Sequence, residues 1–199
     1  MKILSTLLAV ALLTSCGYST RSASSENISS NSNTTISIPY VIGDIDGSLT
    51  SAITQAVAET GHFKCVNTGG DLDLLVRVTS QKEDLIGFRF DRLGPGGTLQ
   101  DRLEPVERRR FITVEVSLVD NASGKILIEK ETVKAHEDYD YVDSHSINDL
   151  SFLTPTGSRI STLEFSLGQL DSVQGAQDNA AIPLFQKIGE QIAYALMNQ

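Results

Sequence analysis

One amphipathic stretch decides the fold of this chain: Ser48-Leu49-Thr50-Ser51-Ala52-Ile53-Thr54-Gln55-Ala56-Val57-Ala58-Glu59-Thr60-Gly61. Its apolar residues recur at the spacing that places them on one face of a helix. They are Leu49, Ala52, Ile53, Ala56 and Val57. Ser48 can cap the start of this helix, and Gly61 stands where the helix should stop. The stretch therefore predicts a helix with one buried face.

Short apolar segments on both sides of this helix predict two strands. Ile36 to Val41 alternates as a strand does, and Pro39 suits an edge position or a strand end. Phe63 to Val66 is the second segment. Because a strand, a helix and a strand in succession usually form a crossover, we expect these two strands to be parallel.

Further strands and a second helix are expected downstream. Alternation predicts strands over 72–79 and 112–118, and the turn 120–125 leads to a strand over 126–135. Residues 160–167 predict an additional short strand. A C-terminal helix is expected over 179–197, with Pro183 tolerable only in its first turn. It should bury Ile182, Phe185, Ile188, Ile192 and Leu196.

The predicted fold class is α+β, with a mixed β-sheet of four to five strands and two helices packed on one face, in the order β-α-β-β-β-(β)-α. This arrangement buries both apolar helix faces against one sheet. A long excursion separates the strands at 79 and 112, with Gly94-Pro95-Gly96-Gly97 near its tip. A second loop-like stretch is expected over 137–158.

The N-terminus has the features of a lipoprotein signal. Lys2 gives a basic start, Ile3 to Leu13 form an apolar run, and small residues precede a cysteine in Leu13-Thr14-Ser15-Cys16. The run is shorter than the ~20 residues that span a bilayer. The cysteine resembles that of a lipobox, so we expect residues 1–15 to be removed and Cys16 to carry a lipid. The alternative is an ordinary secretory signal with an incidental cysteine.

Composition divides the rest of the chain. Of the 17 residues from Ser19 to Thr35, 13 are Ser, Thr or Asn, which predicts a flexible lipidated tether over 16–34. Residues 35–199 are then expected to form a single α/β domain. With Cys16 lipidated, no partner remains for Cys65, which we interpret as a small core residue. The net charge of -9 argues against a nucleic-acid partner and against broad adhesion to anionic lipid head groups.

Three patterns could carry chemistry, and each has a simpler interpretation. Gly43 to Thr50 holds Asp44 and Asp46 and is similar to the first motif of haloacid-dehalogenase phosphatases, but no downstream acidic pair for magnesium follows. We interpret it as a loop with a capped helix. The acidic stretch 138–143 lacks the glycine and the closing glutamate of a calcium loop, so a solvated loop is favoured. The three histidines are not spaced as zinc ligands. We therefore expect no enzyme activity, no cofactor and no metal.

Arginines gather in the excursion of this acidic chain. Over 87–110 there are six arginines and four acidic residues. The arginines are Arg89, Arg92, Arg102, Arg108, Arg109 and Arg110. Guanidinium groups suit bidentate contacts with phosphate. The alternative is a solvated hairpin whose charges pair locally.

Short segments along the chain together resemble the LptE family of lipopolysaccharide-assembly lipoproteins of the outer membrane. They are Cys16-Gly17-Tyr18, Ile36-Ser37-Ile38-Pro39, Leu49 to Thr60, Gly61-His62-Phe63-Lys64-Cys65-Val66, Val114 to Asp120, Ser123-Gly124-Lys125 and Ala180 to Met197. The excursion over 87–110 is longer and richer in glycine than the family pattern, and 137–174 looks like an insertion.

The resemblance implies a lipid-anchored protein at the inner leaflet of the outer membrane, facing the periplasm. Such a protein would plug an LptD-type β-barrel, assist its assembly and support delivery of lipopolysaccharide or lipooligosaccharide to the cell surface. It also implies a binding region around the first long hairpin, carried over here as Arg89, Arg92, Arg108, Arg109 and Arg110. The alternative is a periplasmic lipoprotein of the curli-secretion or synthase-activator type, which acts through protein contacts.

Metabolic labelling with radioactive palmitate tests the anchor. The full-length protein should incorporate the label, and the Cys16→Ser variant should lose it because the acylated thiol is gone. The Cys65→Ser variant is the matched control and should be labelled like the natural sequence. Equal labelling of all three proteins would contradict lipidation at Cys16.

Overall fold

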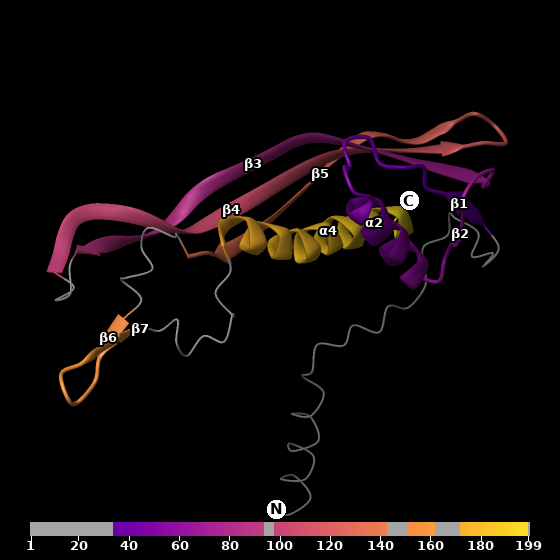
Figure 1. The fold of residues 1–199 in the computed structure, drawn as a ribbon. Helices are drawn as coiled ribbons and strands as arrows, with labels where there is room; N and C mark the ends of the chain where they lie inside the picture. Colours follow the sequence, from indigo (N-terminus) through magenta and orange to yellow (C-terminus); the bar gives the residue numbers. More distant parts are fainter. Residues whose placement is uncertain (1–33, 94–97, 143–150, 162–171, 199) are drawn as a thin grey trace, which may run out of the picture.

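The computed structural model describes residues 34–93, 98–142, 151–161 and 172–198, so Cys16, the signal and nearly all of the tether lie outside the described residues. Figure 1 shows the chain. Its elements are β1 (Thr35–Ser37), α2 (Ser48–Glu59), β2 (Lys64–Val66), β3 (Leu72–Leu93), β4 (Thr98–Asp120), β5 (Ile126–Asp140), β6 (Ser151–Leu153), β7 (Arg159–Ser161) and α4 (Val173–Met197). The predicted α+β class, with a mixed sheet and two helices, is confirmed.

The main sheet has the strand order β2-β1-β3-β4-β5. β1 runs parallel to both β2 and β3, whereas β3, β4 and β5 are antiparallel. The predicted parallel pairing around the first helix is therefore confirmed. β1 ends before Pro39, earlier than predicted, because proline has no N–H for the ladder. The chain rejoins the sheet at Ile42, whose carbonyl accepts a hydrogen bond of 2.8 Å from the Val78 N–H.

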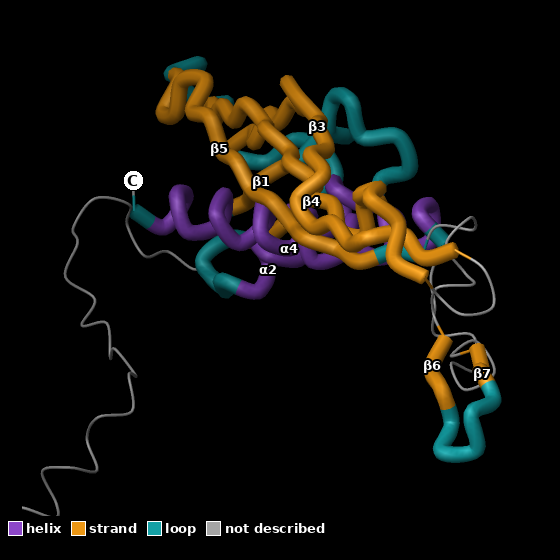
Figure 2. Tube along the Cα trace, turned by 90° about the vertical axis from the view of Figure 1, so that its left-hand side faces the viewer, coloured by secondary structure: helices purple, strands orange, loops and turns teal. Residues whose placement is uncertain are grey.

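Both helices lie on the same face of this sheet (Figures 1 and 2). α2 buries Leu49, Ile53 and Val57, as its periodicity predicts. The predicted cap at Ser48 is wrong by one residue. Gly47 occupies the cap position with φ 82°, a left-handed conformation that glycine adopts without strain, and Ser48 is already helical.

α4 begins earlier than predicted, and Pro183 lies inside it instead of in its first turn. The missing N–H of a proline in a helix interior costs ~3 kcal/mol. Packing offsets this cost, because Ala176 and Ala180 in the early turns are buried against Tyr139 and Tyr141. The predicted burial of Ile182 is also wrong, since its side chain is 61% exposed. The predicted burial of Ile188, Ile192 and Leu196 is confirmed, Leu184 is buried with them, and Phe185 is half-buried.

The predicted excursion over 87–110 is strand on both sides of 94–97. β3 and β4 contain 22 and 23 residues and pair from Leu72 with Asp120 out to Leu93 with Thr98. Several register shifts, including those on both sides of Gly87, interrupt the ladder. The distal part of this pair, named here the ribbon (88–93 and 98–105), extends past the start of α4 in Figure 1. The strands predicted to end at 79 and to begin at 112 are therefore too short.

The second predicted loop is also partly strand. β5 continues to Asp140, so the first residues of the 137–158 stretch pair with β4. β6 and β7 form a separate two-stranded hairpin. β7 covers only the start of the strand predicted over 160–167, and residues 162–171 lie outside the described residues.

The core lies between the helices and the sheet. It contains Ile36, Leu74, Val114 and Leu118 from the strands, packed with the buried faces of α2 and α4. Cys65 packs against this core, as predicted, and its burial raises the pKa of the thiol. Within the described ranges, no helix meets the length and hydropathy that a membrane span requires.

α2 and α4 pack closely against each other at Gly189. A Cβ on this glycine would lie 2.8 Å from the carbonyl oxygen of Ala52 and 3.0 Å from the Cβ of Ala56. The first of these neighbours is backbone and cannot rotate away. A side chain at position 189 would collide with α2, so the position requires glycine.

The Gly189→Ala variant should lower the free energy of unfolding by about 1–3 kcal/mol, because the added methyl group forces the helices apart. The higher helix propensity of alanine alone would raise the free energy of unfolding by about 1 kcal/mol. Urea unfolding followed by circular dichroism measures the difference. The neighbouring exposed Glu190→Ala variant is the control and should unfold like the natural sequence. A stabilised Gly189→Ala variant would contradict the close contact.

Candidate functional site

The arginines of the predicted binding region lie on the ribbon and on the adjoining part of β4. Arg89 is half-buried and pairs through its backbone with Glu104, while Arg92 pairs with Leu99. Arg102 contacts two carboxylates, those of Asp91 at 2.8 Å and Glu104.

Arg108 and Arg110 face the side of the sheet that carries α4. The guanidinium of Arg108 lies 4.9 Å from the centre of the Tyr141 ring and 3.4 Å from a carboxylate oxygen of Glu83. Arg110 donates one hydrogen bond of 3.2 Å to the carbonyl of Gln177, within α4. Both side chains therefore connect β4 to neighbouring elements.

Arg109 lies on the opposite face, because successive side chains of a strand alternate. Its Nε and Nη2 donate hydrogen bonds of 2.6 and 2.7 Å to the two carboxylate oxygens of Asp138 on β5. This bidentate pair lowers the pKa of Asp138, mainly through the hydrogen bonds from Arg109. The acidic stretch 138–143 is therefore not a purely solvated loop: Asp138 is paired, and Tyr139 and Tyr141 are buried.

The consecutive arginines thus do not form one cationic patch. Strand pairing brings Arg108, Arg109 and Arg110 together in β4, but alternation divides them between two faces and each guanidinium has a protein partner. The sequence contains no local signal for these partners, since Glu83, Asp138 and Gln177 come from distant segments. Binding of phosphate by this region stays a prediction.

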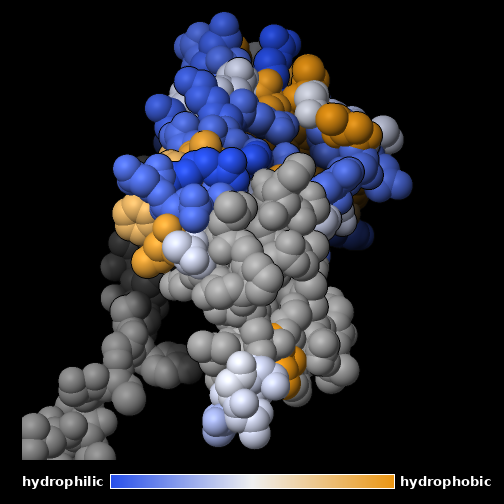
Figure 3. All heavy atoms as spheres, turned by 60° about the vertical axis from the view of Figure 1, so that its left-hand side comes forward, coloured by the Kyte–Doolittle hydropathy of each residue, from blue (hydrophilic) through white to orange (hydrophobic). Residues whose placement is uncertain are grey.

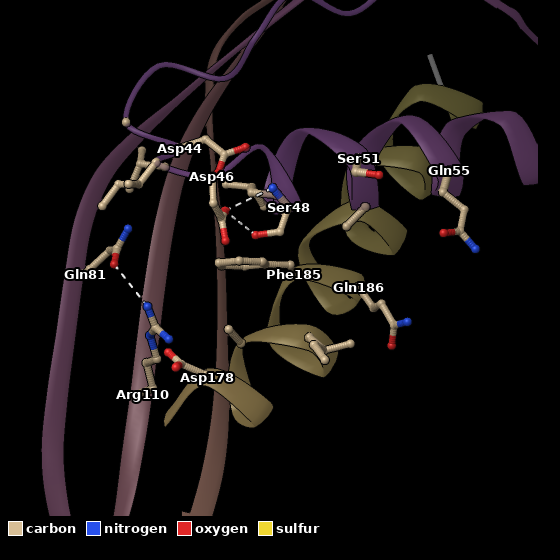
Figure 4. A pocket seen from close by; sticks show the side chains of 17 residues that line it. Asp44, Asp46, Ser48, Ser51, Gln55, Gln81, Arg110, Asp178, Phe185 and Gln186 are labelled. Atoms are coloured by element: carbon tan, nitrogen blue, oxygen red, sulfur yellow. Dashed lines mark hydrogen bonds between the residues drawn. The ribbon is translucent and has the colours of Figure 1, made fainter. Parts of the chain in front are cut away.

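The loop before α2 holds its two aspartates in structural hydrogen bonds, and Figure 4 shows those between Asp46 and Ser48. The Asp44 carboxylate accepts hydrogen bonds from the Thr50 N–H at 2.8 Å, from the Thr50 hydroxyl at 2.6 Å and from the Gly47 N–H at 3.2 Å. Asp46 accepts from the Ser48 N–H at 3.1 Å and from its hydroxyl, and these bonds lower the pKa of Asp46. This is the geometry of a capped helix start.

A groove opens beside this loop, between the start of α2, the α4 helix and β3. Its cavity volume is about 630 Å³. Asp44, Asp46 and Asp178 line it together with Arg110, while Phe185 and Ile182 contribute apolar surface. Figure 4 shows Phe185 in the middle of this arrangement, below Asp46 and above Asp178. In the part of the chain that the structure describes, no three His, Cys, Asp or Glu side chains are grouped to hold a metal ion.

The ribbon carries exposed apolar side chains. Phe88, Phe90, Leu99 and Leu103 are each more than half exposed. Phe90 pairs with Leu103 across the two strands, so these side chains lie next to each other on one face. The surface seen in Figure 3 is mostly hydrophilic, with separate hydrophobic patches. Apolar clusters of this kind mark contact surfaces more often than isolated exposed residues do.

Comparison with known proteins gives structural neighbours only. No protein-family model and no curated protein matches the sequence. A minor lipoprotein from Acinetobacter baumannii is similar in structure, with 13% identity, a TM-score of 0.43 and coverage of 81% of this chain and 88% of that chain. A putative lipoprotein from Caulobacter crescentus is similar at 15% identity, with a TM-score of 0.43 and coverage of 83% and 87%. The rare lipoprotein B from Shewanella oneidensis has 14% identity, a TM-score of 0.39 and coverage of 82% and 97%.

The Arg109–Asp138 pair predicts a pH-dependent contribution to stability. Since the pKa of Asp138 is lowered in the folded protein, the contribution is present above the ordinary value of 3.8 and is lost as the pH falls through the folded value. The Asp138→Asn variant should therefore unfold more easily than the natural sequence at pH 7, by less than about 1 kcal/mol for a partly exposed pair. The difference should shrink as the pH falls below 3.8.

Urea unfolding at several pH values measures this dependence. Asp140→Asn, on the same strand, is the matched control, since Asp140 is exposed. A difference for Asp138→Asn that stays constant from pH 7 to pH 3 would show that the pair does not act through ionisation.

Proposed function

We propose that this protein is a lipid-anchored, non-catalytic lipoprotein of the outer membrane that faces the periplasm. In this proposal it plugs an LptD-type β-barrel, assists its assembly and supports transport of lipopolysaccharide or lipooligosaccharide to the outer surface. Its anchor is Cys16, and its contact surfaces are the ribbon and the arginine-bearing part of β4.

The main support is the position in the fold of the segments that resemble the LptE family. Residues 36–39, 49–60 and 61–66 fall in β1, α2 and β2 and the short connections beside them. Residues 114–120 and 180–197 fall in β4 and α4. All of these elements contribute to one sheet and its two covering helices, so the segments that carry the resemblance belong to one packed body.

The shape and polarity of the ribbon agree with a role in protein contact. At about 3.3 Å per residue, a strand of the length of β3 spans roughly 70 Å. One face of the ribbon exposes Phe88 and Phe90. The guanidinium of Arg102 is paired with the carboxylates of Asp91 and Glu104. A two-stranded ribbon has marginal stability alone in water, and a partner surface would stabilise it.

The absence of catalysis in this proposal rests on the best catalytic candidate. Both Asp44 and Asp46 accept hydrogen bonds from backbone N–H groups at the start of α2. A carboxylate held in this way caps the helix start. We therefore assign these aspartates a structural role in place of a catalytic one.

Capture of the lipidated protein from its native host tests the proposal. An affinity-tagged copy, extracted in mild detergent, should retain one outer-membrane β-barrel in near-stoichiometric amount together with lipopolysaccharide. The double variant Phe88→Ser/Phe90→Ser should lower barrel capture at least ~fivefold, since it removes exposed apolar contact area. Leu75→Ser, which alters an exposed apolar residue of β3 outside the ribbon, is the matched control and should retain the barrel.

Two results would contradict the proposal. Capture of another protein without an LptD-type barrel would favour the alternative, a lipoprotein of the curli-secretion or synthase-activator type. Equal barrel capture by the double variant and the control would show that the ribbon does not contact the barrel.

A further inference from the structure

The geometry points to a second binding site, the groove between α2, α4 and β3, which takes a segment of a partner protein that carries basic side chains next to apolar ones. The inference does not depend on the identity of the barrel or on the ribbon. It rests on the charge, the exposed apolar side chains and the rigidity of the groove.

The charge of the groove is acidic and unbalanced. Asp44, Asp46 and Asp178 line it, against the single guanidinium of Arg110. Arg110 already donates hydrogen bonds to Gln177 and Gln81. Among the described residues, none of the three aspartates forms an ion pair, in contrast to Asp138 and Asp91 elsewhere on the sheet. The three carboxylates outnumber the one guanidinium, so cationic side chains of a ligand would meet an excess of negative charge.

Apolar side chains flank the same groove. Ile45, at the tip of the loop before α2, is 95% exposed, and Ile182 on α4 is 61% exposed. Phe185 lines the space between the two helices and is half-buried. Isolated exposed isoleucines are ordinary, but two of them beside a concave space with an aromatic side chain form the usual surroundings of a ligand.

The groove is held in shape by its own elements. The Asp44 carboxylate fixes the loop to Thr50 and Gly47, and Gly43 and Gly47 adopt left-handed conformations at its two ends. The contact of Gly189 with Ala52 fixes α4 against α2. A site that is already formed loses little conformational entropy when a ligand binds.

These features together favour a polypeptide ligand over a nucleic acid, an anionic lipid or a small cation. The acidic lining repels nucleic acid and anionic lipid head groups. A small cation such as a polyamine would satisfy the carboxylates but would leave Ile45, Ile182 and Phe185 exposed. A chain segment with lysine or arginine beside valine or leucine satisfies both sets of groups, so charge complementarity and apolar burial favour the same occupant.

Fluorescence anisotropy with defined probes tests the site on the full-length protein in detergent. The probe is a fluorescein-labelled decapeptide of alternating lysine and valine. Two comparison peptides replace every lysine by glutamate or every valine by serine, and spermidine serves as a competitor. The lysine–valine peptide should bind saturably, each comparison peptide should bind at least ~tenfold more weakly, and spermidine should compete only weakly.

Substitutions assign the binding to the groove. Asp178→Asn and Ile182→Ser should each weaken binding of the lysine–valine peptide at least ~fivefold. Glu190→Gln and Tyr194→Ser, which alter exposed residues of the same helix outside the groove, should change it less than twofold. Thermal unfolding by circular dichroism verifies that each variant is folded.

Three outcomes would overturn the inference. One is the absence of saturable binding of the lysine–valine peptide, and another is equal binding of the glutamate peptide. The third is a pair of folded groove variants that bind like the natural sequence. Loss of the barrel partner in the capture experiment would leave all of these measurements unchanged, so the two proposals fail separately.

Discussion

The close contact between α2 and α4 over one face of the sheet is the constraint on which the rest of the structure depends. Gly189 permits the two helices to approach until only a hydrogen atom fits against the carbonyl of Ala52. At this distance the buried faces of both helices reach Leu74, Val114 and Leu118 of the sheet at once. The loop that carries Asp44 and the groove beside it are positioned by this contact, because they lie at the start of α2.

The ribbon lies outside the region that this contact packs together. Apolar burial is concentrated where β3 and β4 lie over the helices, and Ile112 is the last fully buried side chain of β4 toward the ribbon. Beyond this point the strands are held by their own ladder and by paired charges such as Arg108 with Glu83 and Arg109 with Asp138. The charged side chains of this region therefore have structural partners even though the sequence suggested a cationic patch. The groove shows the opposite pattern, in which three carboxylates line the space with a single guanidinium. The two surfaces are thus suited to different partners.

The local parts of the fold could be predicted from the sequence, and the long-range parts could not. The α2 face of Leu49, Ile53 and Val57 follows from periodicity alone. The parallel pairing of β1 and β2 follows from the succession of strand, helix and strand. The early start of α4 could not be predicted, because Pro183 argues against it and only the distant Tyr139 and Tyr141 compensate.

The full length of β3 and β4 could not be predicted from the sequence either. Phe88-Arg89-Phe90-Asp91 alternates as a strand does, but its apolar side chains are exposed and do not mark a face buried over the core. For the candidate site, the presence of six arginines was visible in the sequence. Their partners were not, since Glu83, Asp138 and Gln177 are brought to them only by strand register and by the packing of α4.

Native-state hydrogen exchange tests most directly whether the helices and the sheet form one cooperative body. The account predicts that amides of Ile53 in α2, Ile188 in α4 and Val116 in β4 exchange with one common free energy, that of global unfolding. Amides of the ribbon, such as Phe90 and Leu103, should exchange with a much lower one. Exchange of the α4 amides at a free energy several kcal/mol below that of β4, at about the level of the ribbon, would contradict the claim that the contact between the helices holds the fold together.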